Sequence, residues 1–174
     1  AADDSAARGE VDSGRLAEPF WYPDSPLTTP DPRRPFTGRP PRGAVPPAGP
    51  GILVPDAPVT TPAGTRFREC ARDGLLLLLT PGTTSATKET AEQVARTVAG
   101  PASVLELEAI DSTGALNKAL RAGRREVWVI RPDAHVAAVL AEPGPTELAR
   151  VVRQALGGQS EREGANNGVL PANR

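Results

Sequence analysis

The sequence predicts an α/β domain in which strands and helices follow in the order β-α-β-α-β-β-α. Two observations predict this class. Short apolar runs alternate with longer stretches in which apolar residues recur every three or four positions. Glycine and proline separate these segments at most junctions, which is typical of tight connections between strands and helices.

The first half of this domain is predicted to contain two strands joined by a helix. Leu75–Thr80 is an apolar run that stops at Pro81-Gly82, which indicates a buried strand. A helix is predicted over Thr83–Ala99, because a Thr or Ser near its start can cap the first turn and Gly100-Pro101 ends the pattern. Ser103–Ile110 is predicted to be the second strand.

The second half is predicted to contain two helices and a hairpin. Ser112–Ala122 has a helical pattern, and Glu126–Arg131 is predicted to be the third strand. Pro132-Asp133 favours a tight turn into His135–Leu140, so the last two strands should form a hairpin. The last helix is predicted over Glu142–Leu156. Right-handed strand–helix–strand crossovers make the first strands parallel, and the hairpin adds an antiparallel pair, which is the connectivity of a thioredoxin-like fold.

Composition divides the chain into four segments. Residues 1–18 are polar and are expected to be the end of an upstream domain; the absence of a starting Met hints at a fragment. Residues 19–64 hold 14 of the 20 prolines and four of the six aromatic residues. This proline-rich connector should run extended and lie against a protein surface. The thioredoxin-like domain is predicted over residues 65–158, and residues 159–174 are predicted to be a disordered tail.

Charge and composition exclude several classes of partner. The net charge is −1 and no basic cluster occurs, so no nucleic-acid partner is expected. The longest apolar run, Leu75–Leu79, is much shorter than the roughly 20 residues of a membrane span, so no membrane partner is expected either. No secretory signal pattern is present, so a cytoplasmic location is predicted. One cysteine and one histidine exclude an intramolecular disulfide, a CxxC pair and a zinc site built from several cysteines or imidazoles.

The single cysteine and the single histidine are the first candidates for chemistry. Arg68 and Arg72 flank Cys70 and would favour a thiolate, so a stand-alone thiol redox protein acting through Cys70 is one alternative hypothesis. Cys70 precedes the first predicted strand rather than a helix N-terminus, and an inert residue is the preferred interpretation. His135 follows Asp133 by two positions, but the predicted turn already explains Asp133, so we expect no catalytic role for His135.

Other motifs also give no reactive site. No GxGxxG, GxxxxGK[ST] or GxSxG pattern occurs, so the chain is predicted to bind neither FAD nor NAD(P)H by motifs of its own. Glu106 and Glu108 are interpreted as one solvated strand face. Pro32-Arg33-Arg34-Pro35 and Arg39-Pro40-Pro41-Arg42 have PxxP spacing, which makes a proline-rich adaptor a second alternative, although a structural role is preferred. The sequence therefore predicts no catalytic, cofactor-binding or metal-binding residue.

Several segments, in this order, resemble the C-terminal region of class A FAD-dependent aromatic monooxygenases, the family of phenol, hydroxyphenylpropionate and polyketide hydroxylases. The strand–turn–strand stretch Val129–Ala138, with its Arg131-Pro132-Asp133 turn, is the most similar. The other matching pieces are Gly14-Arg15-Leu16, Pro19, Tyr22, Ser25-Pro26-Leu27, Gly51, Pro55-Asp56 and Gly74-Leu75-Leu76-Leu77-Leu78.

The resemblance implies a parent enzyme that binds FAD, takes hydride from NAD(P)H and hydroxylates an aromatic ring. It implies for this chain a non-catalytic thioredoxin-like module that gives structural support or makes subunit contacts. The expected partner is an upstream FAD-binding domain or a second subunit. All the FAD motifs of the family precede the matching region, so no catalytic or cofactor-binding residue transfers to this chain.

Two positions depart from the family pattern. The usual glycine of the hairpin turn is Ala134, and a left-handed backbone there would cost a non-glycine residue about 1 kcal/mol. We therefore predict that φ stays negative at Ala134. The aromatic residue often found near the end of the motif is Ala138, which puts the packing of that face in doubt.

Overall fold

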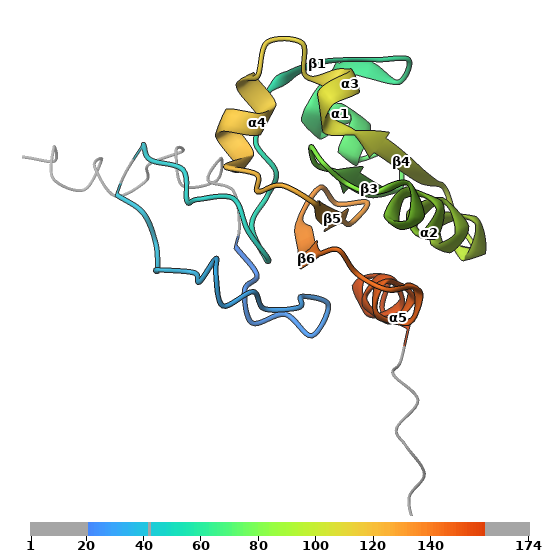
Figure 1. Ribbon diagram of the computed structural model, residues 1–174. Helices are drawn as coiled ribbons and strands as arrows, with labels where there is room; N and C mark the ends of the chain where they lie inside the picture. The colour runs from blue at the N-terminus through green and yellow to red at the C-terminus, as the bar shows by residue number, and fades with distance from the viewer. Residues whose placement is uncertain (1–20, 42, 159–174) are drawn as a thin grey trace, which may run out of the picture.

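A four-stranded mixed sheet in the order β4-β3-β5-β6 lies at the centre of the structure (Figure 1). The computed structural model describes residues 21–41 and 43–158. β3 and β4 are parallel, whereas β5 is antiparallel to both β3 and β6. The mixed α/β class predicted from the sequence is confirmed. The four strands are β3 (Leu75–Leu79), β4 (Ala102–Glu106), β5 (Glu126–Ile130) and β6 (Val136–Ala141).

Both faces of the central strand β3 are covered, which explains its uninterrupted run of leucines. Successive side chains of a strand point to opposite faces. Leu76 and Leu78 belong to the apolar cluster on one face. Leu75, Leu77 and Leu79 belong to the cluster on the other face, and all five side chains are buried. A strand covered on both sides has no solvent face to keep polar, so the sequence shows no alternation.

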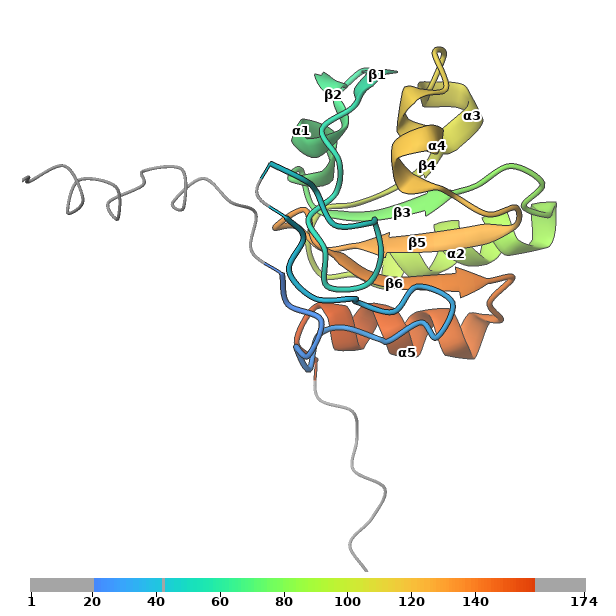
Figure 2. The same cartoon turned by 90° about the vertical axis from the view of Figure 1, so that its left-hand side faces the viewer.

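Helices cover the two faces of the sheet unequally (Figure 2). The long helices α2 and α5 lie on one face, and the short helices α1, α3 and α4 lie on the other. A separate hairpin pairs β1 with β2 in antiparallel fashion. These elements are β1 (Pro58–Thr61), β2 (Gly64–Arg66), α1 (Phe67–Ala71), α2 (Ser85–Thr97), α3 (Leu107–Ile110), α4 (Ala115–Leu120) and α5 (Pro145–Ala155).

The long helices begin where the sequence provides suitable caps. The helix predicted over Thr83–Ala99 is α2, and the hydroxyl oxygen of Thr84 accepts a hydrogen bond from the Thr87 N–H at 3.2 Å. The helix predicted over Glu142–Leu156 is α5, which begins only at Pro145. Proline suits the first turn of a helix because its missing N–H has no partner there in any case.

The strand predicted over Ser103–Ile110 is too long. β4 ends at Glu106, and the next four residues form α3. Leu107 and Ile110 are three positions apart and both buried, which fits one face of a helical turn better than an alternating strand. Glu106 and Glu108 therefore do not share a strand face, so that part of the interpretation is wrong, although both side chains are exposed as predicted. The helix predicted over Ser112–Ala122 is also shorter, because α4 is bounded by left-handed residues.

The prediction of a negative φ at Ala134 is wrong. Its φ is 65°, in the left-handed region. The Ala134 N–H donates to the Arg131 carbonyl at 2.8 Å, and the Ala134 carbonyl accepts from the Val54 N–H at 2.9 Å. These bonds and the fully buried methyl group hold the strained backbone in place. A short hairpin loop that ends in a left-handed residue is a common connection. Ala138 is fully buried among the side chains of the α2–α5 face, so the face that lacks the aromatic residue is nevertheless packed.

Residues 21–41 and 43–57, which we call the strap, run across the outer edge of β6 (Figure 2). The Thr29 N–H donates to the Ala137 carbonyl at 2.8 Å, and the Gly51 N–H donates to the Val136 carbonyl at 2.7 Å. Val54, further along the strap, is fully buried in the core. The prediction that the proline-rich segment lies against a protein surface is therefore confirmed. The β1–β2 hairpin and α1 were not predicted, and the predicted tail over residues 159–174 lies outside the described residues.

Arg121 offers a direct test of backbone strain. It is exposed, ends α4 and has a φ of 49°. Arg121→Gly should raise the free energy of unfolding by about 1 kcal/mol, because glycine adopts this conformation without a Cβ penalty. Urea unfolding followed by circular dichroism measures the difference.

Ala134→Gly is the matched comparison at a buried left-handed position. It removes the strain but also a buried methyl group worth about 0.8 kcal/mol, so its net effect should be close to zero. A destabilised Arg121→Gly variant would contradict the strain argument.

Candidate functional site

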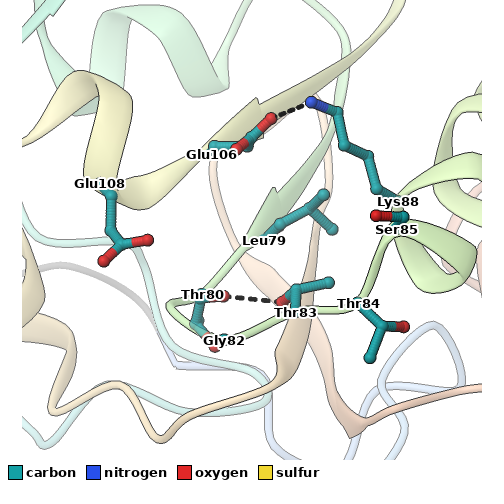
Figure 3. Close-up of a pocket in the computed structure, with 9 residues that line it drawn as sticks. All are labelled: Leu79, Thr80, Gly82, Thr83, Thr84, Ser85, Lys88, Glu106 and Glu108. Carbon is teal, nitrogen blue, oxygen red and sulfur yellow. Dashed lines mark hydrogen bonds and ion pairs between the residues drawn. The ribbon is translucent and has the colours of Figure 1, made fainter.

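A pocket opens at the carboxyl ends of β3 and β4, beside the N-terminus of α2 (Figure 3). Ligand sites of α/β folds commonly occupy this end of the strands, so the pocket is the first place to look for chemistry. Its volume is about 230 Å³. It is lined by Leu79, Thr80, Gly82, Thr83, Thr84, Ser85, Lys88, Glu106 and Glu108.

Two threonines of this pocket are engaged in local structure. The Thr83 hydroxyl donates to the Thr80 carbonyl at 2.7 Å, and the Thr84 hydroxyl oxygen caps α2. Lys88 and Glu106 form an ion pair across the pocket mouth, and the hydrogen bond that Lys88 donates to the Glu106 carboxylate raises the pKa of Lys88 (Figure 3). Both side chains are about half exposed. No cysteine or histidine is among the lining residues, so the pocket offers no thiolate or imidazole for catalysis.

The surroundings of Cys70 differ from those of a reactive thiol. It lies on α1 and only 4% of its surface is exposed. Its Sγ is 3.1 Å from the Thr61 hydroxyl oxygen. The Arg68 guanidinium, which the sequence suggested as a thiolate partner, instead donates to the Val54 carbonyl at 2.9 Å. A buried thiol of this kind is typical of an inert cysteine.

His135 lies in the hairpin turn that the sequence predicted. Its backbone N–H donates to Asp133 Oδ1 at 3.1 Å, which confirms the turn role assigned to Asp133. The His135 Nδ1 is 3.2 Å from the Asp133 carbonyl oxygen, and the Tyr22 ring meets the imidazole edge-on at 5.2 Å between centroids. Arg131 forms an ion pair with Asp133 across the same turn. The imidazole is therefore used to close the turn beneath the strap.

The most strongly organised polar cluster is one that the sequence analysis missed. Glu126, the first residue of β5, is only 3% exposed. One of its carboxylate oxygens, Oε2, accepts from the Gly123 N–H at 2.8 Å and from the Trp128 indole N–H at 3.0 Å. An Arg34 guanidinium nitrogen lies 2.9 Å from both carboxylate oxygens. The same guanidinium sits 4.9 Å from the centre of the Trp128 ring, which adds a cation–π contact.

Arg34 and its neighbours belong to the PxxP motif of the strap. Asp31 is buried and accepts hydrogen bonds from the backbone and the side chain of Arg33. Burial acts to raise the pKa of Asp31, but the hydrogen bonds and charges of Arg33, with the charge of Arg34, outweigh it and hold the pKa below its usual value. The motif therefore binds the domain itself, which supports the structural interpretation over an adaptor role.

Gln154 on α5 forms a second polar anchor for the strap. Its Nε2 donates to the Pro26 carbonyl at 2.9 Å. Its Oε1 accepts from the Thr29 hydroxyl at 3.4 Å. The strap is thus held at its start by α5 and further along by β5. These two anchors make the strap part of the folded domain.

Within residues 21–41 and 43–158, no group of three or more His, Cys, Asp or Glu side chains is placed to hold a metal ion. In the same part of the chain, no helix has the length and apolar character needed to cross a membrane.

The geometry defines a mixed α/β domain with an edge strap and a pocket without thiols. Over residues 48–158 the chain matches the family model described as aromatic-ring hydroxylase, C-terminal. The chain belongs to this family of C-terminal domains. The comparison with curated proteins gives no match.

Three solved structures contain a similar fold. A ternary complex of aklavinone-11 hydroxylase with FAD and aklavinone is 22% identical over 84% of this chain, with a TM-score of 0.64. The flavin-dependent monooxygenase PieE, in complex with FAD and substrate, is 20% identical over 89% of the chain, with a TM-score of 0.63. The RebC-10x structure is 24% identical over 89%, with a TM-score of 0.58. The chain spans only about a quarter of these proteins, 28%, 28% and 26% respectively.

The buried pair of Arg34 and Glu126 predicts a large mutational effect. Arg34→Ala should lower the free energy of unfolding by about 3 kcal/mol, because it removes the guanidinium that donates to both oxygens of the buried Glu126 carboxylate. Only the exposed Arg33, 3.7 Å from Glu126 Oε1, would remain as a counter-ion. Arg33→Ala is the matched control. The Arg33 side chain is 54% exposed, so its loss should cost less than about 1 kcal/mol. Equal effects of the two variants in urea unfolding would contradict the assigned roles.

Asp31 predicts an acid-sensitive contribution to stability. Its pKa is lowered in the folded chain, so the ionised carboxylate stabilises the fold above the unfolded-state pKa. That stabilisation is lost as the pH falls through the folded-state pKa. Asp31→Asn should therefore be destabilising by about 1 kcal/mol at pH 7 and nearly neutral below both pKa values. Thermal unfolding of both proteins from pH 7 to pH 2 measures the difference, and a constant gap across this range would contradict it.

Proposed function

We propose that this chain is the non-catalytic, thioredoxin-like C-terminal module of an FAD-dependent hydroxylase that uses NAD(P)H to hydroxylate aromatic substrates. Its role in that enzyme is structural support or subunit contacts. The observation that carries the proposal is the pocket beside α2. Where a redox thioredoxin would need cysteine, the turn before α2 carries Thr83 and the N-cap residue Thr84.

The order and direction of the strands support the thioredoxin-like assignment. The first two strands of the sheet, β3 and β4, are parallel, and the β5–β6 hairpin adds the antiparallel pair. α2 and α5 lie on one face and α4 on the other. These are the relations expected from the β-α-β-α-β-β-α order.

In this proposal, FAD and NAD(P)H bind to a domain upstream of this chain. Two of the similar structures are described as complexes with FAD, and this chain corresponds to about a quarter of their length. The chain itself has no glycine-rich phosphate-binding motif. We therefore place the flavin in a domain that precedes this chain, with the chain docked on it or on a second subunit. A cytoplasmic location is part of the same proposal.

The two alternatives have less support. A stand-alone thiol redox protein needs an accessible thiolate, whereas Cys70 is buried beside a threonine hydroxyl. A proline-rich adaptor needs accessible arginines, whereas Arg34 is bound to Glu126.

A flavin titration tests whether the chain carries its own cofactor site. FAD added to the purified 174-residue chain should keep the fluorescence of free flavin, and gel filtration should separate the two. A stoichiometric yellow complex would overturn the proposal that the flavin site lies upstream.

Substitutions in the hydroxylase test the non-catalytic role. In a polypeptide that carries the flavin-binding domain ahead of this chain, Cys70→Ser and Lys88→Met should leave kcat for aromatic hydroxylation within about twofold. Both changes leave the fold anchors intact, and Arg34→Ala serves as the destabilising comparison. A hundredfold loss of kcat in either of the first two variants, with unchanged thermal stability and flavin content, would show that the module takes part in catalysis.

A further inference from the structure

Exposed aromatic side chains lie on the strap, which is the outermost layer on one side of the domain (Figure 1). In the described part of the chain, four large apolar residues are more than a third exposed, and three of them, Tyr22, Phe36 and Val45, belong to the strap. Trp21 precedes Tyr22 and packs against Phe36 with 6.0 Å between the ring centroids. We call Trp21, Tyr22 and Phe36 together the aromatic patch.

The backbone that carries the patch is held in place, although the side chains are exposed. The Tyr22 N–H donates to the Gly51 carbonyl at 2.8 Å, and the Tyr22 carbonyl accepts from the Thr28 hydroxyl at 3.1 Å. Phe36 follows by two positions the arginine that anchors the strap, Arg34. Aromatic residues are enriched in the cores of protein interfaces, and a surface that is already ordered loses little entropy when a partner covers it.

The indole of Trp21 lacks one interaction within the domain. Its Nε1 atom is buried, yet it has no hydrogen-bond partner among the described residues. The other tryptophan, Trp128, donates its indole N–H to the Glu126 carboxylate at 3.0 Å. A buried indole N–H usually has an acceptor. Because the Trp21 side chain is only partly buried, a turn of the ring would bring its N–H to an acceptor on a surface docked against the patch.

We propose that the aromatic patch is the surface on which the upstream flavin-binding domain docks, an inference that rests on the proposed function. The docked face of that domain is apolar and offers a carbonyl or carboxylate acceptor to the Trp21 N–H. The polypeptide enters the described domain at Trp21, so any domain that precedes this chain is connected to it through the patch. Covalent connection and exposed aromatic surface therefore coincide on the strap.

The size of the patch favours a tethered partner over a second copy of the chain. Tyr22 is 45% exposed and Phe36 is 37% exposed, so together they expose on the order of 200 Å². A stable interface between separate proteins buries about 800 Å² on each partner. A flexible connection holds a tethered domain at an effective concentration on the order of millimolar, so a smaller contact is sufficient within one polypeptide.

Hydroxyl-radical footprinting tests the proposal by comparing two forms of the protein. One is the 174-residue chain, and the other is a longer polypeptide that carries the flavin-binding domain ahead of it. A docked surface excludes water from aromatic anchors, so Tyr22 and Phe36 should be oxidised about fivefold more slowly in the longer form. Leu156, which is 42% exposed at the end of α5, is the internal control and should be oxidised equally in both forms.

A double variant, Tyr22→Ser with Phe36→Ser, distinguishes docking from the mere presence of the upstream domain. In the unaltered protein, Trp21 should be oxidised more slowly in the longer form than in the shorter one. In the double variant, the two forms should oxidise Trp21 at the same rate. Leu156→Ser is the matched control, because it removes a similarly exposed apolar side chain outside the strap, and it should preserve the protection of Trp21.

Several outcomes would overturn the proposal. Equal oxidation of Tyr22 and Phe36 in both forms, with FAD bound to the longer one, would reject the docking surface without affecting the proposed function. Protection of Leu156 in place of the patch would assign docking to another face. Protection that rises with protein concentration, together with a dimer in gel filtration, would assign the patch to a second copy. A longer polypeptide that binds no flavin would refute the proposed function, and this inference with it.

Discussion

The buried carboxylate of Glu126 is the constraint on which the arrangement of this domain depends. An ionised group removed from water costs several kcal/mol unless charged and hydrogen-bonding partners surround it. Here the partners come from separate places: Gly123 before the strand, Trp128 within it, and Arg34 from the strap. The carboxylate is satisfied only when all three segments are in place, so this one residue couples the position of the strap to the formation of the sheet.

This coupling explains why the folded unit extends beyond the part that matches the family model. The match begins at residue 48, yet the charged anchor at Arg34 and the backbone bond from Thr29 to Ala137 precede it. Prolines are tolerated along this path because the strap lies at the edge of the sheet and needs few backbone donors. Where a donor is required, as at Thr29 and Gly51, the sequence has a residue other than proline.

The periodicity of apolar residues predicted the helices and strands that pack against the core along their whole length. β3, α2, β5, β6 and α5 were all recognisable, because burial on one or both faces leaves a repeating pattern in the sequence. The transition from β4 to α3 was missed, since a short apolar stretch fits either period. The pairing of Arg34 with Glu126 was also missed, because partners 92 residues apart leave no spacing signal. Two features of the sequence could have indicated this pair. Glu126 is a charged residue at the start of an apolar strand, and the proline-rich connector that carries Arg34 is rich in aromatic residues.

The stability of the domain does not depend on reactive side chains in the pocket. The start of α2 needs an acceptor for its first N–H groups, and the Thr84 hydroxyl oxygen supplies one. No part of that requirement involves sulfur. The apolar clusters on the two faces of the sheet are equally independent of the pocket, because its lining residues contribute only Leu79 to them. The thioredoxin-like arrangement that we propose therefore depends on packing of the two apolar clusters. The residues between β3 and α2 need only cap the helix, and no reactive side chain is required among them.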